Sequence, residues 1–150
     1  MTSLLRRVTP LLGAAALVLA AVPAAATAQS HANLVWDQLK RGYDSNQSQG
    51  FSARNYIMGR MNDDASDTWS FTLTAGMTYK FWGACDGDCS DLDIELQDDN
   101  GNVLESDVLD DDNPIVEYRA KKSGTFKVKV TMATCNTNPC YWGFAIFQKS

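Results

Sequence analysis

The sequence has one histidine, His31, and no surplus of basic residues, since 13 Lys and Arg stand against 18 Asp and Glu. The shortage of histidine argues against most proton-transfer catalysis near neutral pH and against His-based metal centres. A formal net charge of −5 argues against a nucleic-acid-binding protein, because phosphate recognition needs a basic surface. We expect His31 to be an exposed residue of a mobile terminal segment. No nucleophile motif such as G-x-S-x-G is present to supply catalysis.

Long apolar runs are missing after residue 28, and the single run before it is short. Arg6 and Arg7 precede an apolar stretch over residues 11–22, and Ala26-Thr27-Ala28 supplies small residues for a signal peptidase. A membrane anchor would need about 20 apolar residues. We therefore predict that residues 1–28 are a signal peptide cleaved after Ala28, with cleavage after Ala26 as the neighbouring alternative. The mature protein is then periplasmic or secreted, with no membrane span.

Cysteines are few but even in number, and they come in two close pairs. The pairs are Cys85 with Cys89 and Cys135 with Cys140, each separated by turn-forming residues. In an exported protein this favours two disulfides, and of three possible connectivities we predict the two local bridges. A zinc site is the alternative, but the CxxC spacing typical of zinc knuckles is absent.

Helical periodicity is confined to residues 31–43, where Val35, Leu39 and Tyr43 recur at i, i+4 and i+8 and Gly42 is a stop signal. Residues 45–50 are polar and are predicted to be a linker. We therefore assign residues 29–50 to a helical leader and linker. Val35, Leu39 and Tyr43 are expected to pack near the last strand.

From residue 54 onward apolar and polar residues alternate with a period of two, and turn residues recur every 8–12 positions. This pattern predicts an all-β fold: an antiparallel two-layer β-sandwich of about eight strands over residues 51–150, preceded by the short helix. The expected core residues are Trp69, Phe71, Tyr79, Phe81, Leu92, Ile94, Phe126 and Val128.

Two strands carry aromatic residues that a single inward face does not account for. Trp82 has the solvent parity of its strand, and the last strand is apolar on both faces, with Tyr141 on one face and Trp142 on the other. An apolar outer surface is covered by something, either the leader helix or a partner. Trp82, Tyr141 and Trp142 are therefore the candidate binding surface.

Three segments of the β region resemble the pre-peptidase C-terminal (PPC) domain, a small sandwich of secreted bacterial proteins. They are Asp67-Thr-Trp-Ser-Phe-Thr-Leu73, Asp91-Leu-Asp-Ile-Glu-Leu96 and Ser123-Gly-Thr-Phe-Lys-Val-Lys-Val130, with turns at Ala75-Gly76 and Asp99-Asn-Gly101. The resemblance implies a non-catalytic module that in some relatives adheres to a substrate such as collagen. It also implies a calcium site in the acidic loop at residues 62–67, with Asp63, Asp64 and Asp67 as candidate ligands.

Basic residues are absent from residues 86–112, which contain twelve Asp or Glu. Asp86, Asp88, Asp91 and Asp93 lie close together in sequence, and calcium is bound by carboxylate and carbonyl oxygens. They are the second set of candidate calcium ligands, and calcium is the only cofactor we predict. The other interpretation is a solubilising surface. Glycoside hydrolysis is the enzymatic interpretation of these acids. It would need two carboxylates across a deep cleft, one of them with a raised pKa.

These observations predict an exported, non-catalytic binding or structural module. Its partner would be a protein or polymer of the cell envelope or extracellular space. An accessory protein or inhibitor of a secreted hydrolase is the alternative, in which the acidic loops face a basic partner. A small hydrolase is the third and weakest reading.

Overall fold

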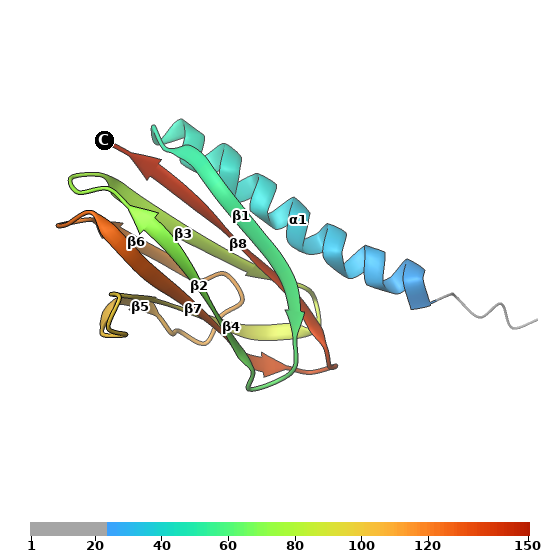
Figure 1. Cartoon of the computed structure of the whole chain (residues 1–150). Coiled ribbons are helices and arrows are strands. Elements are labelled where there is room, and N and C mark those ends of the chain that lie inside the picture. The colour runs from blue at the N-terminus through green and yellow to red at the C-terminus, as the bar shows by residue number, and fades with distance from the viewer. Residues whose placement is uncertain (1–23) are drawn as a thin grey trace, which may run out of the picture.

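A computed structural model describes residues 24–150 of the chain, so most of the predicted signal peptide lies outside the described residues (Figure 1). One helix, α1 (Ala24–Ser48), precedes eight strands. The strands are β1 (Ser52–Met61), β2 (Ser66–Leu73), β3 (Thr78–Cys85), β4 (Cys89–Gln97), β5 (Val103–Asp107), β6 (Ile115–Arg119), β7 (Gly124–Cys135) and β8 (Cys140–Lys149). Within the described residues, no helix is both long and apolar enough to cross a membrane.

The strands form two four-stranded sheets, with the orders β1-β8-β3-β6 and β2-β7-β4-β5. All six described pairings are antiparallel. The two-layer sandwich predicted from the alternation is therefore confirmed. Pairing follows side-chain parity, as where Ile94 of β4 lies opposite Val130 of β7 and both are fully buried.

The main core lies between the two sheets. Tyr79, Phe81, Leu92, Ile94, Phe126 and Val128 are all buried there, as predicted. Trp69 is not, because 38% of its surface is exposed, and Phe71 is only partly buried. Both residues belong to β2, an edge strand, where the opposite sheet covers the inner face incompletely.

Helix α1 is longer than predicted and absorbs most of the predicted linker. Gly42 does not end the helix. A Cβ at this position would lie 3.1 Å from the Trp82 ring, so the glycine allows the helix to approach β3 closely. The helix ends only before Gly50, whose φ of 82° is the left-handed conformation typical of a helix C-terminus. The amide of Gly50 donates to the carbonyl of Gln47, 3.0 Å away.

A second, smaller apolar layer lies between α1 and the outer face of the β1-β8-β3 sheet (Figure 1). Val35 and Leu39 are buried there, as predicted, and the layer also contains Phe51, Ala84, Ala145 and Phe147. Tyr43 was expected in this layer, but it is 42% exposed. The helix approaches the sheet closely at Gly143, where a Cβ would lie 3.1 Å from the Leu39 side chain.

Candidate functional site

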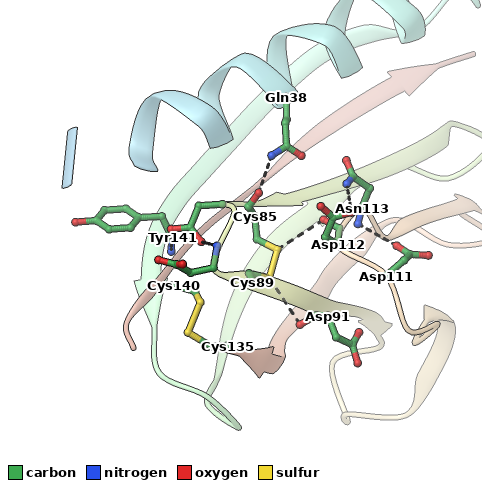
Figure 2. Close-up of a disulfide and its surroundings, with 12 residues drawn as sticks. Gln38, Cys85, Cys89, Asp91, Asp111, Asp112, Asn113, Cys135, Cys140 and Tyr141 are labelled. Carbon is green, nitrogen blue, oxygen red and sulfur yellow. Dashed lines mark hydrogen bonds between the residues drawn. A yellow bond between two sulfur atoms is a disulfide. The ribbon is translucent and has the colours of Figure 1, made fainter. Parts of the chain in front are cut away.

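Both local disulfides are present, Cys85–Cys89 and Cys135–Cys140. The first joins the end of β3 to the start of β4, and the second joins the end of β7 to the start of β8. Figure 2 shows the two bridges at the same end of the sandwich, with Gln38 of α1 above them. The Gln38 side chain donates a hydrogen bond to the carbonyl of Cys85, 2.6 Å away, so the helix is attached to this end.

The Cys85–Cys89 loop holds a buried carboxylate. The Asp86 side chain has no exposed surface, and it accepts hydrogen bonds from the backbone amides of Asp88 (3.2 Å) and Tyr141 (3.0 Å). A buried carboxylate needs such partners, because it loses the hydration that stabilises its charge. Asp86 therefore ties the β3–β4 turn to the first residues of β8.

His31 lies against this loop instead of in a mobile terminal segment. Its Nδ1 is 2.8 Å from Oδ2 of Asp86 and 3.8 Å from Oδ2 of Asp88. Its ring stacks on Tyr141 with centroids 6.0 Å apart. Our expectation of an exposed terminal histidine is wrong. Helix α1 begins at Ala24, before His31, and places the His31 side chain against the sandwich. His31, Asp86 and Asp88 are the one described group of three metal-ligating side chains whose ligand atoms lie within 4.8 Å of one another.

Of the predicted calcium ligands of the first loop, Asp63 and Asp64 lie in the turn between β1 and β2, and Asp67 lies on β2 itself. Oδ1 of Asp63 accepts a hydrogen bond from the Cys135 amide, 2.6 Å away, and its own amide donates to Oδ1 of Asn138. Asp64 has a positive φ of 58°, and Asp67 is exposed on the edge strand β2. The side-chain ligand atoms of Asp63, Asp64 and Asp67 do not all lie within 4.8 Å of one another, so this calcium site stays a prediction.

Asp91 and Asp93 lie on β4, away from Asp86 and Asp88. Burial and the neighbouring charges of Asp110 and Asp111 raise the pKa of Asp91 above its usual value. Burial also raises the pKa of Asp93, with Asp91 and Glu95 adding to the effect. Oδ1 of Asp91 is buried and has no hydrogen-bond partner among residues 24–150, and Figure 2 shows this side chain near the loop that carries Asp111. The second predicted set is therefore divided between two places.

The predicted aromatic surface does not exist as one exposed patch. Trp142 is 1% exposed and belongs to the main core, stacked 6.2 Å from Phe144. Trp82 is partly buried under α1, and Tyr141 is partly buried beside His31. Trp142 was misassigned because both faces of β8 are apolar, so the sequence does not show which face lies between the sheets.

A groove that the sequence analysis missed lies between α1 and the first half of β1. Its cavity volume is about 420 Å³, within the range of ligand-binding sites. The α1–β1 groove is lined by Trp36, Leu39, Lys40, Tyr43, Ala53, Arg54, Asn55, Tyr56, Ala145 and Phe147. The signal in the sequence was the spacing of Trp36, Leu39 and Tyr43 at i, i+3 and i+7. This spacing places the two aromatic side chains on the helix face next to buried Leu39.

Comparison with protein families identifies part of the sandwich. Residues 65–131 match the sequence model of the bacterial pre-peptidase C-terminal domain. The matched segment contains β2 to β6 and most of β7. These residues form a PPC-like domain. No curated protein matches the chain. Helix α1, β1 and β8 lie outside the matched residues, and they supply His31 and the whole lining of the α1–β1 groove.

Proposed function

We propose that the chain, built around its PPC-like domain, is a non-catalytic binding module exported by a bacterial cell. We also propose that it binds an extended acidic segment of a protein partner in the α1–β1 groove. The observation that carries this proposal is the groove itself, an apolar and aromatic hollow beside an exposed sheet edge. The two disulfides are compatible with an extracytoplasmic location.

The exposed backbone edge of β1 is the reason for proposing an extended ligand. β1 is the outermost strand of its sheet, and residues 52–56 are exposed. A further strand can add to such an edge by main-chain hydrogen bonds, while neighbouring pockets select side chains. The rings of Trp36 and Tyr56, with centroids 5.2 Å apart, would receive apolar side chains of the added strand.

The basic residues of the groove are the reason for proposing an acidic ligand. Lys40 and Arg54 line the groove, and Arg54 forms no ion pair within the described residues. Within the described part of the chain the ion-pair partner of Lys40 is Asp37, and both side chains are more than half exposed, so this pair is weak. Residues 86–112 are strongly acidic and would repel the same ligand. The difference in charge would steer an acidic segment to the groove.

A displayed library of random peptides tests the proposal on the mature protein. We expect enrichment of acidic peptides with apolar residues, and loss of binding in Trp36→Ala/Tyr56→Ala and in Arg54→Glu. Val103→Ala, at a half-exposed site on β5, is the matched control and should bind normally. N-methylation of alternate backbone amides of an enriched peptide should abolish binding if the peptide adds to β1 as a strand. Peptides that bind all variants equally would contradict the groove as the site.

The same library tests the alternative of a hydrolase accessory or inhibitor. In that case basic peptides would be enriched instead, and their binding would depend on the acidic loop at residues 109–114. Charge-removing variants at Asp110 and Asp112 would then weaken binding, while the groove variants would not.

Calcium stabilisation is a separate proposal, supported by the crowding of carboxylates around Asp91. Burial raises its pKa, as do the charges of Asp110 and Asp111, and one of its oxygens is buried without a partner in the described structure. A cation that binds only the folded form raises its stability by mass action. Millimolar calcium should raise the melting temperature more than sodium chloride of equal ionic strength, and Asp91→Asn should remove the difference. Equal shifts in both salts would show screening alone.

A further inference from the structure

His31 is the third residue after the predicted cleavage site. The sequence there is Ala28 followed by Gln29, Ser30 and His31. In α1 the amides of Ser30 and His31 bond to carbonyls four residues earlier, which belong to the segment that cleavage removes. Cleavage therefore leaves these two backbone nitrogens without acceptors, as at any new helix N-terminus.

We propose that the mature N-terminus is a copper(II) site, which also takes nickel(II). Its ligands are four nitrogens: the α-amino group of Gln29, the backbone nitrogens of Ser30 and His31, and Nδ1 of His31. A tetragonal arrangement of nitrogen ligands is the preference of copper(II) and nickel(II). Binding releases to water the two amide protons and any proton on the amine or imidazole, as expected when ligands must be deprotonated. No oxidation or reduction is involved.

The carboxylates of the Cys85–Cys89 loop make this N-terminus more than a flexible chelating peptide. Asp86 and Asp88 lie 2.8 and 3.8 Å from His31 Nδ1, so a cation approaching that nitrogen meets two negative charges. The disulfide fixes the loop, and Tyr141 holds the imidazole ring from one side. A solvent-accessible hollow of about 180 Å³, lined in part by His31, Asp88 and Tyr141, gives an ion access to this place.

Copper at Nδ1 would replace the hydrogen bond between His31 and Asp86. Asp86 keeps its bonds from the amides of Asp88 and Tyr141, so the buried carboxylate is still satisfied. The ion would then lie beside the loop and continue to hold the start of α1 against the sandwich. Calcium is not expected here, because it prefers oxygen ligands.

The proposal rests on export and on cleavage after Ala28, so the experiment tests cleavage first. The full-length chain is expressed in a bacterium, and the exported protein is purified and its N-terminus is read by mass spectrometry. A protein that begins at Gln29 with a free amine satisfies the premise. A retained leader, a start at Thr27 or a cyclised Gln29 would overturn the copper site in the native protein without bearing on the groove.

Copper(II) titration of that protein, followed by visible absorption and electron paramagnetic resonance, then tests the site. We expect one copper ion per chain with coupling to four nitrogens. Ser30→Pro is the decisive variant, because proline has no amide proton to release yet is tolerated in the first turn of a helix. Ser30→Ala is its matched control and should bind copper normally. Ser30→Pro and His31→Ala should both lose the four-nitrogen signal.

Two further measurements locate the ion. Asp88→Asn should weaken copper binding about tenfold, the effect typical of a neighbouring group that supports a metal ligand. Paramagnetic copper should broaden NMR signals of residues 86–88 and Tyr141 but not those of β5. Unchanged binding by Ser30→Pro would assign the ion to side chains alone and overturn the proposal. Absence of broadening in the loop would overturn the role of Asp86 and Asp88.

Discussion

Strand β8 contributes side chains to both apolar layers of this molecule, and the two layers are built differently. On one face of β8, Trp142, Phe144 and Ile146 enter the main core, which is enclosed by two sheets. On the other face, Ala145 and Phe147 pack in the smaller layer beneath α1, together with Phe51. The first layer is closed by many long-range pairings, whereas the second depends on one helix whose start is attached at His31 and Gln38. We therefore expect the main core to set global stability and the helix layer to open without unfolding of the sandwich.

Loss of a large side chain from the main core should have the largest effect. Phe144 is fully buried and contacts Phe71 edge to face, with centroids 5.9 Å apart. Phe144→Ala should lower the free energy of unfolding by about 3–5 kcal/mol, because the cavity cannot collapse between two sheets. Denaturant unfolding followed by tryptophan fluorescence measures it. Ile115→Ala, at a 41% exposed site, is the control and should change stability little. A small loss at Phe144 would contradict a closely packed main core.

The helix layer should give a smaller and more local effect. Leu39→Ala should cost about 2 kcal/mol, the lower end for a buried leucine, because α1 can shift to fill the space. Protease cleavage within α1 should increase more than cleavage within the strands. Leu34 is 49% exposed on the same helix, and Leu34→Ala should have little effect on either measurement. Equal protection of α1 and the strands in Leu39→Ala would show that the two layers unfold together.

The two disulfides offer a matched pair at one end of the molecule. Each closes a short loop, so replacing either pair with alanines should cost about 2 kcal/mol. Only the Cys85–Cys89 loop carries the carboxylate that holds His31, so only its removal should also free α1 for hydrogen exchange. If Cys135→Ala/Cys140→Ala frees α1 to the same extent, the His31–Asp86 contact does not hold the helix.

The acidic side of the sandwich should give the smallest effects, of opposite signs at two carboxylates. Side-chain and backbone hydrogen bonds from Asn102 lower the pKa of Asp98, so its charge stabilises the fold at neutral pH. That contribution is lost as the pH falls through the lowered pKa of the folded state. The pKa of Asp91 is raised, so its charge destabilises the fold at neutral pH, and this penalty disappears as the pH falls toward 3.8.

Thermal unfolding as a function of pH separates the two carboxylates. At neutral pH, Asp98→Asn should lower the melting temperature and Asp91→Asn should raise it. Both differences should vanish in strong acid, where the native carboxyls are protonated as well. Differences that persist unchanged in acid would show that packing, and not charge, causes them.

The sequence predicted the sandwich because strand parity is a local signal, repeated from Phe126 to Val130 and from Leu92 to Leu96. It also predicted both disulfides, because short loops of turn residues join each pair. It failed where two parities were apolar, as at Trp142, and where an edge strand left Trp69 uncovered. The contact of His31 with Asp86 joins residues 55 positions apart, and nothing local to either residue indicates it. The groove depends on how α1 lies against β1, which periodicity alone does not give.

The position of β8 has a consequence for how the protein is made. β8 lies between β1 and β3, so a strand late in the sequence separates two strands that are synthesised much earlier. Among the described residues, β1 pairs only with β8, and α1 covers a surface to which β8 contributes Ala145 and Phe147. Until β8 emerges, β1 lacks its described partner strand and α1 lacks part of the surface against which it packs. Such long-range closure makes folding slow. The first sheet and the helix layer therefore close only after β8 has been synthesised.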